Sequence, residues 1–244
     1  MTPSEPSDPP QLSRLLDLRL AADPASPFIT FYDDATGERI ELSATTLANW
    51  VSKTSGLLVD GFGITPSERV GVWLPVHWQS AAILLACWRV GAEVALAEEA
   101  VGLAFAYAPM LDHARDVADD VVGLALAPMA GRLTDTPVGV VDYAVEIPGH
   151  PDRWTATHPA SDFPALATED GSLTASDLAA RAGSFVHAGE RILVTRSQWD
   201  ETSVVEALLG PLMTGGSVVL VRNPSPDADA VARRVEAEGV TAVL

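Results

Sequence analysis

Residues 69–92, RVGVWLPVHWQSAAILLACWRVGA, decide the fold that we predict for this chain. The apolar run Arg69–Leu74 predicts a buried strand, and His77–Gly91 predicts a helix that is apolar on most of its surface. A second strand pattern follows at Glu93–Ala97. A strand, a helix of about 10–15 residues and another strand are typical of a βαβ unit in a parallel sheet. The sequence therefore predicts an α/β protein.

The same alternation extends in both directions and predicts two α/β lobes, 12–147 and 165–244. Between them lies a linker rich in proline and histidine, 148–164, and before them a disordered N-terminus, 1–11. The last strand pattern reaches the last residue, which predicts an α/β fold that is cut short. Beyond residues 69–97 we expect a hairpin of Phe28–Tyr32 and Arg39–Leu42, helices at Leu47–Leu58, Pro109–Ala118, Leu173–Ala188, Glu201–Met213 and Asp227–Glu238, and strands at Leu103–Tyr107, Val121–Ala127, Arg191–Thr195, Ser217–Val221 and Val240–Leu244.

Charge and composition exclude several classes of partner. The 244 residues include 15 basic and 33 acidic ones, and the formal net charge is −18. Such a surface repels nucleic acids and anionic membranes. The single cysteine, Cys87, forms no internal disulfide, and the longest apolar stretch, Ala81–Trp88, is too short to span a bilayer. We expect a soluble, cytoplasmic protein.

Several segments carry a resemblance to a known family. Leu47–Val51 with Gly61–Val70, and Gly71–Pro75 with Ala81–Ala92, resemble the opening segments of the adenylate-forming enzymes. Ala207–Leu220 and Val235–Leu244 are similar to a later helix–strand unit of the same superfamily. This superfamily contains the AMP-binding acyl-CoA synthetases, the luciferases and the adenylation domains of peptide synthetases. The resemblance covers most of this chain and implies the parallel-sheet layers of the acetyl-CoA synthetase-like N-terminal domain, in truncated form.

The parts that perform chemistry in that superfamily are missing from this sequence. The resemblance places a phosphate-binding loop, rich in Ser, Thr and Gly and ending in Pro-Lys, within Phe163–Leu178. This segment has no glycine cluster and no lysine, and Glu169-Asp170 puts two carboxylates where phosphates bind in the family. The only lysine, Lys53, is out of register with the family's lysines. We therefore assign no catalytic, cofactor-binding or metal-binding residue, and no cofactor.

The resemblance implies a non-catalytic remnant, similar to a group of short AMP-binding-like proteins that lack the nucleotide motifs. Such a protein acts as a binding or protein-interaction module, with self-association or a protein partner expected through the second lobe near Val240–Leu244. The alternative is a split or degenerate AMP-dependent ligase that activates a carboxylate with a half supplied in trans. An enzyme is the less favoured of the two interpretations.

The candidate ligand crevice lies where the first βα unit turns, at Pro75, His77, Trp78 and Ser80. In open α/β sheets, ligands bind outside the carboxyl ends of strands. An acyl or aromatic ligand fits this position better than a nucleotide, although a helix-capping role for His77 is the simpler interpretation. No Gly-x-Ser-x-Gly element supports a hydrolase. His150 and His158 lack the spacing of zinc ligands, and we expect both at the surface.

Overall fold

Two sheets form the framework of the computed structural model, which describes residues 11–155 and 162–244. One sheet has five strands in the order β12-β10-β11-β1-β2, and the other has seven in the order β7-β6-β5-β3-β4-β8-β9. Neighbouring strands are parallel except at β1–β2 and β8–β9, which are antiparallel hairpins. The strands are β1 (Pro27–Asp33), β2 (Glu38–Ser43), β3 (Arg69–Trp73), β4 (Glu93–Ala95), β5 (Val101–Tyr107), β6 (Ala118–Leu124), β7 (Val140–Asp142), β8 (Pro164–Thr168), β9 (Gly171–Thr174), β10 (Arg191–Val194), β11 (Ser217–Arg222) and β12 (Ala242–Val243).

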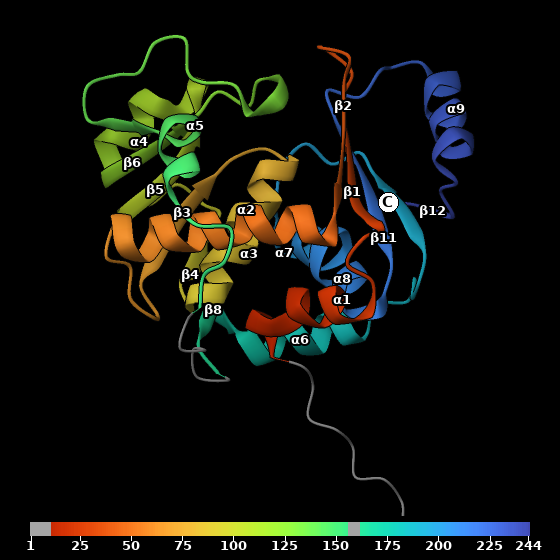
Figure 1. The fold of residues 1–244 in the computed structure, drawn as a ribbon, viewed down its shortest axis with the longest axis horizontal. Helices are drawn as coiled ribbons and strands as arrows, with labels where there is room; N and C mark the ends of the chain where they lie inside the picture. Colours follow the sequence, from red (N-terminus) through yellow and green to blue (C-terminus); the bar gives the residue numbers. More distant parts are fainter. Residues whose placement is uncertain (1–10, 156–161) are drawn as a thin grey trace, which may run out of the picture.

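Helices separate the two sheets and cover their outer faces. Figure 1 shows α2 and α3 between the strands of the two sheets, with α4 outside the seven-stranded sheet and α9 outside the five-stranded one. The layers are thus helix, sheet, helix, sheet, helix. The helices are α1 (Leu15–Ala22), α2 (Ala44–Gly56), α3 (Trp78–Val90), α4 (Leu111–Val117), α5 (Tyr143–Glu146), α6 (Ala175–Gly183), α7 (Glu201–Val204), α8 (Gly210–Thr214) and α9 (Ala228–Glu238).

Helix α3 is the centre of the core. Twelve of its 13 residues are buried, and only Arg89 is not. A helix that is apolar all round must be covered on every side. The sheets supply that cover because their strands are buried on both faces: Val218 and Leu220 of β11 join the core around α3, whereas Val219 and Val221 pack against α9. Cys87, Trp73, Trp78 and Trp88 are all buried.

The two sheets exchange strands across the predicted linker. β1 and β2 come from the first predicted lobe but belong to the five-stranded sheet, where β1 pairs with β11. β8 and β9 follow the linker but extend the seven-stranded sheet through β4. The predicted lobes, 12–147 and 165–244, therefore do not correspond to the two sheets, because parallel strands pair over long sequence separations. Residues 1–10 of the predicted disordered N-terminus, and 156–161 of the linker, which include His158, lie outside the described residues.

Most predicted elements are found, but two predicted helices differ from their expected bounds. The helix predicted at Leu173–Ala188 begins later, at Ala175, because the Thr174 side chain accepts the backbone N–H of Asp177 while Asp177 accepts that of Thr174. The residues before this capping box form β8 and β9, which the sequence did not predict. The helix predicted at Glu201–Met213 is interrupted by a π-helical segment, Val205–Leu209, ahead of α8. None of the helices within residues 11–155 and 162–244 has the length and hydrophobicity to cross a membrane.

Leu84 tests the central position of α3. It is fully buried, so Leu84→Ala removes its contacts with the surrounding core and leaves a cavity. We expect the free energy of unfolding to fall by about 2–5 kcal/mol in urea denaturation. The matched control is Leu18→Ala on α1, where the side chain is 49% exposed and the expected change is within about 0.5 kcal/mol. Equal effects of the two substitutions would contradict the assignment of α3 to the core.

Candidate functional site

The start of α3 is joined to the segment before α7 through the hydroxyl of Ser80. Trp199 donates its indole N–H to Ser80 Oγ at 2.7 Å, and the His77 backbone N–H donates to the same oxygen at 3.0 Å. Ser80 in turn lies 2.8 Å from the carbonyl oxygens of Pro75 and His77 and donates to them. Pro75 also forms an isolated β-bridge with Gln198. This network fixes residues 197–201 against the carboxyl end of β3.

His77 caps α3. Its Nδ1 accepts the Gln79 backbone N–H at 3.1 Å, and its ring packs against Phe31, with the ring centroids 4.2 Å apart. His77 Nε2 is buried and has no hydrogen-bond partner in the described part of the chain. Burial, reinforced by the charge of Arg222, lowers the pKa of His77 to about 3, so the imidazole is neutral at physiological pH.

The structure thus brings the four predicted crevice residues together, but in the packed interior. Pro75, His77, Trp78 and Ser80 are all buried, and none of them lines the cavities described below. The capping role of His77 is confirmed. Contact of these residues with a ligand stays a prediction.

A cavity of about 620 Å³ opens beside the carboxyl ends of β4 and β8. Its apolar wall comes from the segment after β4, from β8 and from the segment that leads into α7: Leu96, Ala97, Leu166, Ala167 and Trp199. A smaller cavity of about 120 Å³ shares Leu96 and Trp199 with it and extends toward the ends of β3 and β5. The larger volume lies within the range of small-molecule sites. Sequence reasoning missed this cavity because two of its walls, β8 and the approach to α7, meet only through the tertiary fold.

Among the described residues that line the larger cavity, the one basic side chain, Arg69, forms ion pairs with carboxylates. Arg69 Nε lies 2.8 Å from Glu93 Oε2, and its Nη1 lies 3.1 Å from Glu99 Oε1. The hydrogen bond that Arg69 donates to Glu93, ahead of the opposing effect of burial, raises the pKa of Arg69. Glu93 is itself buried and accepts the hydroxyl of Ser172. Arg69 is therefore occupied by two carboxylates and is not free for an anionic ligand.

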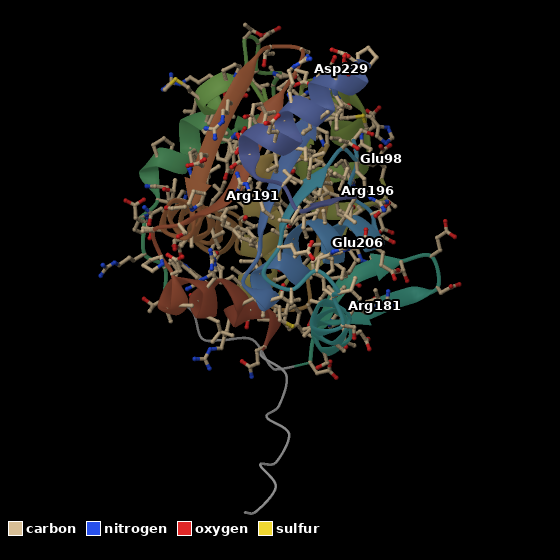
Figure 2. The ribbon with its side chains drawn as sticks, turned by 90° about the vertical axis from the view of Figure 1, so that its right-hand side faces the viewer. Glu98, Arg181, Arg191, Arg196, Glu206 and Asp229 are labelled. Carbon is tan, nitrogen blue, oxygen red and sulfur yellow. The ribbon has the colours of Figure 1, made fainter. Side chains whose placement is uncertain are left out.

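Carboxylates also line the opposite wall. Asp200 caps α7 by accepting the Ser203 backbone N–H at 2.6 Å, and it lies 3.5 Å from Arg196. Partial burial opposes ionisation of Asp200, but the hydrogen bonds from Ser203 outweigh it and lower its pKa. Glu201 forms an ion pair with Arg181. Arg181 and Arg196 are exposed on the face shown in Figure 2.

The segment where the resemblance places a phosphate loop is a tight hairpin. β8 and β9 pair from Pro164–Thr174 to Thr168–Gly171, so that Glu169 and Asp170 form the turn, and Gly171 has a φ of +135°. Both carboxylates are exposed, and Glu169 borders the large cavity. A phosphate cradle needs converging backbone N–H groups and a cation. A two-residue acidic turn supplies neither, so the residues present do not fit a triphosphate.

The only lysine is occupied elsewhere. Lys53 Nζ donates to the backbone oxygen of His150 at 2.7 Å and pairs with Asp152 at 3.1 Å. Lys53 belongs to α2, and its ammonium group lies beside residues 150–152. Within the described ranges, no group of three or more His, Cys, Asp or Glu side chains has the arrangement of a metal site.

Comparison with known proteins identifies the family. A protein of Mycobacterium tuberculosis (strain ATCC 25618 / H37Rv), described as a TIGR03089 family protein, is 41% identical over 237 residues, which span 94% of this chain and 96% of that protein. The chain belongs to the TIGR03089 family. No family model matches it.

Solved structures confirm the fold of this TIGR03089 family member. An acyl-CoA synthetase from Brucella canis superposes with a TM-score of 0.79 at 15% identity, covering 99% of this chain and 48% of that one. The N-terminal domain of FACL13 from Mycobacterium tuberculosis gives a TM-score of 0.73 at 15% identity, covering 96% of this chain and 62% of that one. The chain thus spans about half to two thirds of the solved chains it matches. The predicted fold, that of the N-terminal domain of acyl-CoA synthetase-like ligases, is confirmed.

The buried His77 makes stability depend on pH. Below its ordinary pKa of 6.5 the imidazole of the unfolded chain takes up a proton, whereas the folded chain takes none until about pH 3. The unfolded state then binds more protons, so this contribution to stability is complete above pH 6.5 and is lost as the pH falls. His77→Asn keeps a capping side chain that does not titrate.

Urea denaturation of both proteins at several pH values measures the effect. Relative to His77→Asn, we expect the wild type to lose about 1.4 kcal/mol per pH unit between roughly pH 6.5 and 4.5. Parallel pH profiles for the two proteins would contradict a neutral, buried imidazole in the folded state.

Proposed function

We propose that this protein is a non-catalytic member of the adenylate-forming fold that acts as a binding or protein-interaction module. The observation that carries this proposal is the β8–β9 turn. Glu169 and Asp170 close it within the segment where the resemblance to the adenylate-forming enzymes predicts a phosphate loop, and no lysine lies within residues 163–178. Adenylate formation relies on cations and amide groups that are positioned in advance around the phosphates.

The pairing of the basic residues supports the proposal. Arg69 is held by Glu93 and Glu99, and Lys53 is held by Asp152. A triphosphate approaching the cavity would meet Glu169 and Asp200 instead, and Coulomb repulsion at such distances opposes binding. The scaffold of strands and helices is retained while the phosphate-binding chemistry is not.

ATP-dependent pyrophosphate release tests the proposal directly. With a panel of carboxylic acids and Mg²⁺, we expect no release above the protein-free background, because the triphosphate has no site. Isothermal titration of ATP into the full chain is expected to give no binding heat. An acyl-CoA synthetase run in parallel controls the assay. Micromolar ATP binding, or release that depends on one carboxylic acid, would overturn the proposal.

A split ligase is the second candidate function. The observation that favours it is length: the Brucella canis acyl-CoA synthetase is about twice as long as the region it shares with this chain. A separate polypeptide would then supply the remaining motifs. The test is to find such a C-terminal half encoded near this protein and to add it in the pyrophosphate assay. Release that requires both polypeptides would favour this candidate over the non-catalytic one.

We propose that the protein associates with a second copy of itself through the second lobe. β12 is the terminal strand of the five-stranded sheet and pairs with β10 in the order given above, and Val243 on it is 55% exposed. A terminal strand offers backbone groups for pairing with a second copy of the chain.

Size-exclusion chromatography with light scattering measures this association. We expect a dimer at micromolar concentration that Val243→Lys shifts to the monomer, since a charge at an edge strand opposes pairing. Val186→Lys is the matched control, because Val186 is also exposed, at 84%, but lies outside the sheets. A wild type that is monomeric at tens of micromolar, or a control that dissociates equally, would contradict the assignment.

A further inference from the structure

We propose that the cavity of about 620 Å³ between the β8–β9 hairpin and α7 binds a small organic cation, a protonated amine carried on an apolar body. The proposal goes beyond the interaction role above and rests on it only in that no nucleotide occupies this cavity. Two properties of the walls carry it: an apolar and aromatic surface, and a set of charges in which carboxylates outnumber cations.

The apolar surface defines the body of the ligand. Leu96, Ala97, Leu166 and Ala167 line the cavity together with Trp199. The N–H of this indole is already donated to Ser80, so Trp199 offers the cavity carbon atoms and the π-system of its ring. Aromatic rings attract organic ammonium groups, and more strongly where water is excluded. Trp199 is 6% exposed, so only a small part of its ring faces the cavity.

The charges define the sign of the ligand. One arginine and four carboxylates line the cavity: Arg69, Glu99, Glu169, Asp200 and Glu201. Each basic group at the walls already has an acidic partner, since Arg69 pairs with two glutamates, Arg181 with Glu201, and Arg196 with Glu206 as well as Asp200. Glu169 forms no ion pair within the described residues.

An anion entering the cavity would therefore find no free cation, whereas an ammonium group finds the unpaired carboxylate of Glu169. Asp200 adds to this preference because its separation from Arg196, 3.5 Å, is the longest contact among the ion pairs at these walls. The volume suits a molecule of small-ligand size rather than a protein segment. Glu169 thus acts as the specificity-determining residue of the site.

Three probes of similar shape and different charge test the sign. Phenylbutylamine, phenylbutanol and phenylbutyrate are titrated into the full chain and followed by calorimetry and by the fluorescence of tryptophan. We expect the amine to bind about fivefold or more tightly than the alcohol, as one favourable ion pair allows, and the carboxylate to bind most weakly. Added salt should weaken only the amine. Equal affinities of amine and alcohol, or tighter binding of the carboxylate, would overturn the proposal.

Variants locate the site. Glu169→Gln is expected to weaken amine binding about threefold to fivefold and to leave the alcohol unchanged. Asp170→Asn, the neighbouring exposed carboxylate that does not line the cavity, is the matched control and should have less than half that effect. Ala97→Trp fills the cavity from an exposed position and should abolish binding of all three probes. Equal effects of the two turn variants, or unchanged binding in Ala97→Trp, would place the probe elsewhere and refute the proposal.

An ATP titration in the same series separates the two proposals. Failure of the amine to bind, together with no ATP binding, refutes the cation site and leaves the non-catalytic function standing. Binding of ATP refutes the non-catalytic function whatever the amine does. Thermal unfolding of each variant checks that lost binding does not reflect lost folding.

Discussion

The burial of α3 on every side is the constraint on which the rest of the structure depends. A helix with twelve buried residues among 13 cannot lie on a surface, because each exposed apolar side chain would forgo its transfer free energy. Two sheets are needed to cover it, and the chain supplies them by passing strands from each half of the sequence to the sheet of the other half. Arg89 leaves this core at the end of the helix, where Asp17 of α1 pairs with it at 3.0 Å.

Polar groups inside this core are arranged at the start of α3, where the first turn of a helix leaves N–H groups without intrahelical partners. His77 and Ser80 satisfy two of them, and Ser80 also receives the indole N–H of Trp199. One hydroxyl therefore connects the helix to the segment that leads into α7. A buried donor without an acceptor would lower the free energy of unfolding by about 1–3 kcal/mol, so the Ser80 hydroxyl stabilises the interior by accepting the indole N–H of Trp199.

Electrostatics underlie both proposals about the ligand of this protein. The β8–β9 turn exposes two carboxylates, and the nearby arginines are each held by acidic partners. A net charge of −18 extends the same bias over the molecule. The acidic charges and the apolar wall of the cavity together form the basis of the proposed cation site.

The sequence by itself determined the elements and the missing chemistry. The period of apolar residues predicted α3 and β3, and the absence of lysine from residues 163–178 was visible in the printed letters. Only the tertiary structure decided which strands share a sheet, where β8 and β9 begin, and that Leu166, Trp199 and Glu99 meet around one cavity. The physical reason is range: caps and periodicity act within a few residues, whereas strand pairing and cavities depend on contacts between segments far apart in the sequence, such as β1 and β11, which no local pattern encodes.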